Sequence, residues 1–272
     1  MLEAQVTDSR SEHHSNPETW PFFAVAFAIT GLTQLPAVLA MRGIIAVPFA
    51  RLLPFVAIGA ISPMLAALIT SRFEGSGWRA AFRPLRKWRA NPAWYVLALC
   101  LPGAILALGM ATLQLVSGRN VGPFIYPPSN AQAITGMIVV SLGEEIGWRG
   151  FALPRLQARY GALKAGLILG VLWAIWHVPV LLLAGIHGLT TLSLMIPFFT
   201  AGSVVFTWLY NKTQAGLVLA ILAHMGAHLN NSHQSLPGNT TPLVVHTIVF
   251  SILALALVLG DSKSWQVNRT AS

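Results

Sequence analysis

The sequence predicts an all-α membrane protein, a polytopic bundle of about eight transmembrane helices. Of its 272 residues, 55% are hydrophobic and only 9% are charged, whereas about a quarter of the residues in a soluble domain are charged. The mean hydropathy is +0.65. The apolar residues also gather into runs of roughly the length that a helix needs to cross a bilayer. An ordinary soluble domain is therefore excluded.

Eight apolar runs are predicted to be the spans. They cover residues 20–41, 53–70, 94–116, 131–148, 162–184, 190–210, 215–229 and 242–259. Residues 1–19 are polar and mixed in charge, and we expect a disordered tail there rather than a cleaved signal peptide. Residues 20–260 are expected to form a single membrane domain, and residues 261–272 a second tail.

The basic residues predict that both termini are cytoplasmic. With the N-terminus inside, only Arg42, Arg51 and Arg119 lie outside, and the other fourteen of the 17 Lys and Arg residues lie inside. Such an excess is typical of cytoplasmic loops. We therefore interpret the net charge of +9 as a topology signal. No nucleic-acid partner is expected, because the basic residues are scattered between apolar runs; membrane lipids are the expected surroundings.

Two adjacent carboxylates, Glu144 and Glu145, end the fourth run, and they are the only acidic residues between positions 75 and 260. Ionisable groups at membrane depth cost several kcal/mol unless they are paired or line a wet cavity. Glu145 and Arg149 are one helical turn apart, in the favourable order for an ion pair, whereas Glu144 is rotated by about 100°. We therefore expect Arg149 to hold Glu145 and Glu144 to be poised as a base. The alternative is an ion pair that only anchors the helix.

Two later spans also carry polar groups. Trp173 and His177 lie on one face of the fifth span, and Pro179 is expected to weaken the helix just beyond them. His224 and His228 share a face of the seventh span, a common metal-binding spacing, although the glutamate of H-E-x-x-H is absent. For each group the alternative is ordinary packing or a polar contact between helices.

In this order the three groups resemble the motifs of a known family. They read Glu144-Glu145-x-x-x-Arg149, Trp173-x-x-x-His177 and His224-x-x-x-His228. The CAAX protease and bacteriocin-processing (CPBP, or ABI) family of intramembrane proteases, which includes the type II CAAX prenyl endopeptidases, has E-E-x-x-x-R, F-x-x-x-H and H-x-x-x-N. The resemblance covers residues 55–235. Trp173 replaces a phenylalanine, and His228 stands where the family has asparagine.

The resemblance implies a protease domain over residues 20–260 that hydrolyses a peptide bond near the cytoplasmic face of a bacterial cell membrane. The implied substrate is a peptide or protein, prenylated or membrane-anchored forms included. The implied roles are water activation by Glu144, water binding by His177, oxyanion stabilisation by His224 and His228, and support of Glu145 by Arg149.

The cofactor and two other functions stay open at this stage. Glu144, His177, His224 and His228 are the candidate ligands of a divalent metal such as Zn²⁺, and the alternative is a metal-free glutamate mechanism. A non-catalytic protein of bacteriocin self-immunity or binding is a second possible function. A proton-coupled transporter is a third, although the sequence lacks the inverted repeat typical of one.

Overall fold

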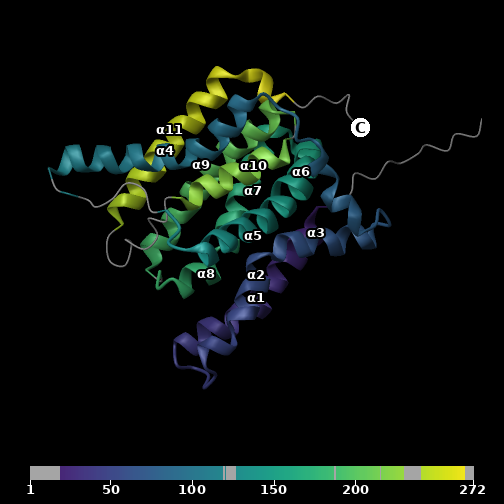
Figure 1. Ribbon diagram of the computed structural model, residues 1–272, viewed down its shortest axis with the longest axis vertical. Coiled ribbons are helices and arrows are strands. Elements are labelled where there is room, and N and C mark those ends of the chain that lie inside the picture. Colours follow the sequence, from purple (N-terminus) through teal and green to yellow (C-terminus); the bar gives the residue numbers. More distant parts are fainter. Residues whose placement is uncertain are drawn as a thin grey trace, which may run out of the picture.

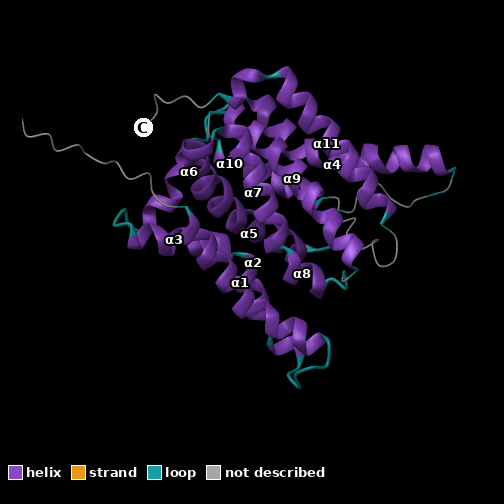
Figure 2. Cartoon of the chain, turned by 180° about the vertical axis from the view of Figure 1, so that it is seen from behind, coloured by secondary structure: helices purple, strands orange, loops and turns teal. Residues whose placement is uncertain are grey.

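The computed structural model describes residues 19–118, 120, 127–186, 188–214, 216–229 and 240–266, and every regular element in them is a helix (Figures 1 and 2). The α-helices are α1 (Trp20–Met41), α2 (Leu53–Ala60), α3 (Ser62–Phe73), α4 (Pro92–Ser117), α5 (Ala131–Gly147), α6 (Leu153–Tyr160), α7 (Ala162–Trp176), α8 (Val178–Leu183), α9 (Leu189–Lys212), α10 (Leu217–His228) and α11 (Thr241–Gly260). Three short 3₁₀ segments are η1 (Phe49–Arg51), η2 (Trp78–Arg86) and η5 (Ser262–Trp265), and a π-helical segment, η3 (Trp148–Ala152), joins α5 to α6. Residues 1–18 and 267–272 of the two predicted tails lie outside the described residues.

The chain is an integral membrane protein. Five helical stretches in the described residues are long and apolar enough to cross a membrane, namely α1, α4, α7 with α8, α9 and α11. The pair α2 and α3, bent by 61°, would make a sixth. Large apolar side chains such as Leu32 and Leu115 are 78% and 85% exposed, as expected where lipid surrounds the bundle. Helices α5 and α10 have 17 and 12 residues, fewer than the roughly 20 that a full span needs, so eight spans and cytoplasmic termini stay predictions.

The run predicted as one second span is broken at Ile61. Pro63 has no N–H, so the carbonyl of Gly59 loses its helical partner. The hydroxyl of Thr30 in α1 lies 3.5 Å from that oxygen and 2.6 Å from the hydroxyl of Ser62. Helix α1 thus supplies polar groups to the exposed backbone, and the kink is stabilised inside the bundle.

Helix α5 packs directly on this kink. A Cβ atom on Gly143 would lie 2.6 Å from the Ile61 side chain, and one on Gly147 would overlap the backbone of Pro63. The two glycines flank the glutamate pair on one helical face, so the close approach fixes the depth and rotation of both carboxylates.

Similar close approaches position the other helices of the site. On the far side of α5, α10 crosses α4 so closely that a Cβ on Gly226 would overlap the Leu99 carbonyl. Helix α7 packs on α9 through Gly170, whose Cβ would lie 2.5 Å from Thr200. In Figure 1, α5, α7 and α10 lie near the centre, with α1, α2 and α3 to one side and α4 and α11 to the other. The polar motifs of three separate helices therefore meet in the middle of the bundle.

Candidate active site

The first motif is built at the junction of α5 and η3. A π-helical turn bonds residue i to i+5 and is wider than an α-helical turn. Arg149 lies in this turn, and its Nη1 donates a hydrogen bond of 2.8 Å to Oε1 of Glu145, with both side chains fully buried. The ion pair expected from the spacing of these two residues is present.

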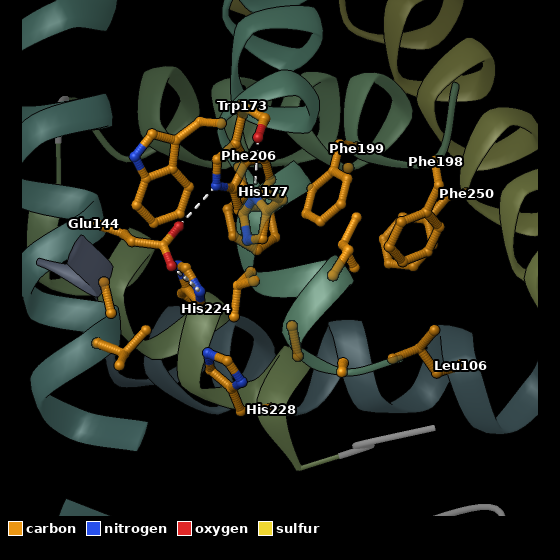
Figure 3. A pocket seen from close by; sticks show the side chains of 18 of the residues that line it. Leu106, Glu144, Trp173, His177, Phe198, Phe199, Phe206, His224, His228 and Phe250 are labelled. Atoms are coloured by element: carbon orange, nitrogen blue, oxygen red, sulfur yellow. Dashed lines mark hydrogen bonds and ion pairs between the residues drawn. The ribbon is translucent and has the colours of Figure 1, made fainter. Parts of the chain in front are cut away.

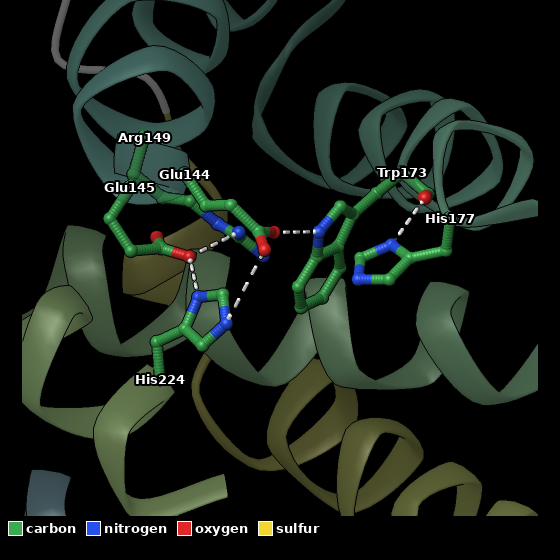
Figure 4. A network of polar contacts seen from close by, with 6 residues as sticks. All are labelled: Glu144, Glu145, Arg149, Trp173, His177 and His224. Carbon is green, nitrogen blue, oxygen red and sulfur yellow. Dashed lines mark hydrogen bonds and ion pairs between the residues drawn. The ribbon is translucent and has the colours of Figure 1, made fainter. Parts of the chain in front are cut away.

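Glu145 has a second partner from another helix. Nδ1 of His224 in α10 donates a hydrogen bond of 2.8 Å to the same Oε1 atom (Figure 4). A carboxylate oxygen has two lone pairs, so it can accept from both donors. One carboxylate therefore joins α5, the π-helical turn and α10.

Glu144 has different surroundings. Its Oε2 accepts a hydrogen bond of 2.7 Å from the indole Nε1 of Trp173 in α7. Its Oε1 lies 3.9 Å from Nε2 of His224, which is too long for a direct hydrogen bond. The side chain of Glu144 is 3% exposed. The two adjacent glutamates thus have distinct environments: Glu145 is fixed by two charged or polar partners, and Glu144 keeps one oxygen facing His224.

Two aromatic rings flank the Arg149 guanidinium. Its central carbon lies 4.5 Å from the centre of the Trp173 ring and 4.9 Å from that of Phe206. Cation–π contacts of this kind compensate part of the cost of burying a charge. Trp173 therefore contacts Glu144 through its N–H and Arg149 through its ring.

The site opens on one cavity of about 690 Å³ (Figure 3). Glu144, His177, His224 and His228 all line it, so the structure brings these four predicted residues together. Glu145 and Arg149 do not line it and lie behind its wall. Most of the remaining lining is apolar and includes Leu106, Phe198, Phe199, Phe206 and Phe250.

The position of His177 follows from a break in its helix. Helix α7 ends at Trp176 and α8 begins at Val178, in agreement with the weakening expected from Pro179. Nδ1 of His177 lies 2.8 Å from the Trp173 carbonyl. Because a carbonyl only accepts, Nδ1 carries the hydrogen in this contact and Nε2 is the acceptor.

Ring contacts also fix the three histidines that line the cavity. The His177 ring stacks on Phe199 with centroids 4.2 Å apart, and Figure 4 shows the Trp173 indole between His177 and Glu144. His228 stacks on His224 with centroids 4.9 Å apart. Both contacts restrict the rotation of imidazoles that face the cavity.

The candidate metal ligands are not gathered into a metal site. Protein zinc sites use three or four ligands, and the described residues contain no group of three or more His, Cys, Asp and Glu side chains that could hold a metal ion. In both His224 and His177 it is Nδ1 that is hydrogen-bonded, to Glu145 and to a backbone carbonyl, and an imidazole fixed in this way binds water, substrate or a metal ion through Nε2.

Sequence reasoning did not find two features of the site. The sequence places Trp173 in the second motif without a hydrogen-bonding role, yet its N–H donates to Glu144. The bond between Glu145 and His224 joins residues 79 positions apart. The shared helical face of Trp173 and His177 was a signal for the first, but nothing local signals the second.

Comparisons with known proteins agree with the motifs. The family described as Type II CAAX prenyl endopeptidase Rce1-like matches residues 127–230, which contain all six predicted site residues. The protein named CAAX prenyl protease 2 of Methanococcus maripaludis is 26% identical over 185 residues, covering 62% of this chain and 65% of that protein. The match therefore spans slightly less than two thirds of the relative's length.

Proposed function

Because the chain belongs to the CAAX protease and bacteriocin-processing family, we propose that it is an intramembrane endopeptidase in which Glu144 activates water. One observation carries the proposal. Glu144 is held by Trp173 through one oxygen and presents the other to His224 at the wall of a cavity, while Glu145 is engaged elsewhere. This is the arrangement that a general base needs, namely one restrained carboxylate with one working oxygen.

The water would lie between Glu144 and His224. Glu145 accepts the Nδ1 hydrogen of His224, so Nε2 of the neutral ring is an acceptor, like Oε1 of Glu144. The 3.9 Å between these two atoms allows one water molecule to donate a hydrogen to each. Glu144 takes one proton, and the hydroxide oxygen bonds to the carbonyl carbon of the scissile peptide.

The tetrahedral intermediate then needs donors and a proton. His228 lines the cavity one helical turn beyond His224, and we assign its ring N–H to the oxyanion, while Nε2 of His224 accepts a hydrogen bond from the hydroxyl group that the water has become. When the C–N bond breaks, Glu144 returns its proton to the leaving nitrogen, which restores the carboxylate. His177 accepts through Nε2 and would hold a water or a substrate N–H at the opposite wall.

Substrate and orientation belong to the same proposal. The substrate is a peptide or protein that reaches the site from within the membrane, and prenylated forms suit the name of the Methanococcus maripaludis relative. The distribution of basic residues supports an orientation with both termini in the cytoplasm. The glutamates would then lie near the cytoplasmic face.

The test is cleavage by the purified full chain in liposomes. The probes are a farnesylated, internally quenched peptide with a C-terminal CAAX sequence and the same peptide anchored by an acyl chain. We expect Glu144→Gln to lower the rate by roughly 10²–10⁴-fold, the usual contribution of a general base. The control is Glu74→Gln, which changes an exposed glutamate paired with Arg155 and should leave cleavage unchanged.

The other functions predict different results. Full cleavage by Glu144→Gln would contradict the role of this residue. Ion flux that needs Glu144 without any peptide cleavage would identify a transporter. Protection against a bacteriocin that survives Glu144→Gln would identify a binding protein.

A further inference from the structure

A dense group of basic residues extends from the last turn of α3 to the residues before α4, and none of them lines the cavity. We define the basic rim as Arg72, Arg79, Arg83, Arg86, Lys87 and Arg89, all of which are exposed. Glu74, the only acidic residue near it in sequence, is paired with Arg155 at 2.8 Å. Within the described part of the chain, no ion pair joins any member of the rim to a carboxylate. Among the described residues, the rim therefore has six cationic side chains and no ion-paired carboxylate.

The 3₁₀ geometry of η2 separates its arginines from its apolar side chains. A 3₁₀-helix has three residues per turn, so residues i and i+3 lie on one face. Phe82 and Leu85 form one face and pack against the hydrophobic core. Arg83 and Arg86 form another face and are exposed. The segment is thus held to the bundle on one side and presents two guanidinium groups, one turn apart, on another.

Exposed tryptophans are interleaved with these charges. Trp78 and Trp88 are 53% and 57% exposed. The guanidinium of Arg79 lies 5.2 Å from the Trp78 ring, and that of Arg89 lies 5.6 Å from the Trp88 ring. Tryptophan is enriched where a bilayer meets water, because its ring is apolar and its N–H is polar.

We propose that the basic rim binds the headgroups of anionic phospholipids. Guanidinium groups bind phosphate oxygens through two parallel hydrogen bonds, and four to eight Lys or Arg residues beside a membrane helix are typical of anionic-lipid sites. The exposed tryptophans favour a lipid surface over an acidic protein, because their rings can enter the interface between headgroups and acyl chains. The rim also extends from the last turn of α3 to the residues before α4, and both of these helices are apolar.

Lipid bound at the basic rim would contact a segment that packs next to the candidate active site. Segment η2 packs against η3, the π-helical turn that contains Arg149. A phospholipid that bridges Arg83 and Arg86 would hold η2 in place against this turn. Anionic lipid should therefore stabilise the folded protein, whatever reaction the cavity performs.

The experiment measures the thermal unfolding midpoint of the full chain in a neutral detergent during titration with lipid. The probes are phosphatidylglycerol, phosphatidylcholine with the same acyl chains, and inorganic phosphate. A ligand that binds only the folded state raises the midpoint. We expect a saturable rise with phosphatidylglycerol, little change with the other two probes, and a smaller rise in 0.5 M salt, a concentration at which screening is strong (about 4 Å Debye length).

Matched variants locate the effect. Arg83→Gln with Arg86→Gln should weaken the apparent affinity for phosphatidylglycerol by about tenfold or more, since each basic residue near an anionic surface contributes substantially. The control is Arg42→Gln with Arg51→Gln, which changes two exposed arginines, one just after the C-terminus of α1 and one in η1, and should keep the wild-type response. Both proteins should elute as single peaks in size-exclusion chromatography.

Each other outcome would overturn the proposal. Equal responses to phosphatidylglycerol and phosphatidylcholine would mean that headgroup charge is not recognised. An unchanged response in the Arg83 and Arg86 variant would place the lipid elsewhere. A rise with inorganic phosphate alone would indicate an anion site without lipid, and an equal rise with a polyglutamate peptide would indicate an acidic protein partner.

Discussion

The indole N–H of Trp173 donates a hydrogen bond of 2.7 Å to Glu144, and the ring of the same residue lies 4.5 Å from the Arg149 guanidinium. Trp173 therefore orients Glu144, the proposed base, and its ring covers Arg149, the cation that is paired with Glu145. A phenylalanine could do only the second. The replacement of phenylalanine by tryptophan in the second motif thus adds a hydrogen bond to the site.

Trp173→Phe separates these two contributions. The ring and its contact with Arg149 are kept, but Glu144 loses a donor worth about 1.5–3 kcal/mol, the range for bonds to charged groups. We expect kcat to fall by roughly ten- to a hundredfold, with little change in KM. The control is Trp176→Phe, which removes an indole bond of 3.0 Å to Ser62 instead. Equal losses in kcat for the two variants would show that the effect is structural.

Glu145→Gln should mainly lower stability. The variant leaves Arg149 buried without its charged partner and weakens the bond to His224. Breaking a buried ion pair on one side typically costs about 3–5 kcal/mol. Glu74→Gln breaks an ion pair of the same 2.8 Å length at the surface and should cost about 0–1 kcal/mol. Unfolding in detergent measures both free energies, and similar values for the two variants would contradict the importance of burial.

Gly147→Ala should disrupt the packing of α5 on the α2–α3 kink. The new Cβ would overlap the backbone of Pro63, which cannot move away by changing a rotamer. We expect the free energy of unfolding to fall by about 1–3 kcal/mol, the usual cost of overpacking. Gly136 lies in the same helix with nothing within 4 Å of an added Cβ, so Gly136→Ala should be neutral or stabilising by up to about 1 kcal/mol. Thermal unfolding compares the two alanine variants directly.

Asp261 should give stability a dependence on acidic pH. It accepts hydrogen bonds from Lys212, Trp208 and Ser264, which lower its pKa from 3.8 to about 2. Because the pKa of Asp261 is lower in the folded state, these contacts stabilise the folded protein fully above about pH 4. Their contribution is lost as the pH falls toward 2. The unfolding midpoints of wild type and Asp261→Asn should therefore differ at pH 7 and converge near pH 2. A difference that does not change with pH would exclude this cause.

Metal removal should not affect cleavage. The described His, Cys, Asp and Glu side chains do not form a group of three that could hold a metal ion. We expect the purified enzyme to keep its activity after dialysis against a chelator. Metal analysis of the same sample should give far less than one zinc per chain. Loss of activity that returns on addition of Zn²⁺ would contradict this prediction.

The helices could be predicted from sequence better than the contacts between them. The first apolar run was predicted over residues 20–41 and forms α1 at those bounds. The second was predicted as continuous because Ile61 and Pro63 are compatible with an apolar run, and only the polar groups of α1 make the break stable there. Periodicity along one helix gives the pairing of Glu145 with Arg149, which are neighbours on that helix.

The rest of the site depends on how helices cross. The contact of His224 with Glu145 requires α10 to lie against α5. The position of α10 depends in turn on its close packing against α4, where Gly226 meets Leu99. No pattern within α10 reports it. The direction of the Trp173 indole likewise depends on the position of α7 relative to α5. Tertiary packing, rather than local spacing, decides which groups face the cavity.

The π-helical turn also determines which changes of chain length the protein can accept. A turn that bonds i to i+5 holds one more residue than the α-helical turns beside it. Removing that extra residue would convert the turn to an α-helical one and leave the following residues near their present orientation. A deletion within α5 itself would instead rotate everything after it by about 100° and turn the buried side chains of Leu153 and Leu156 out of the core. The π-helical turn is therefore the place in this stretch where the loss of one residue should disturb the packing of α6 least.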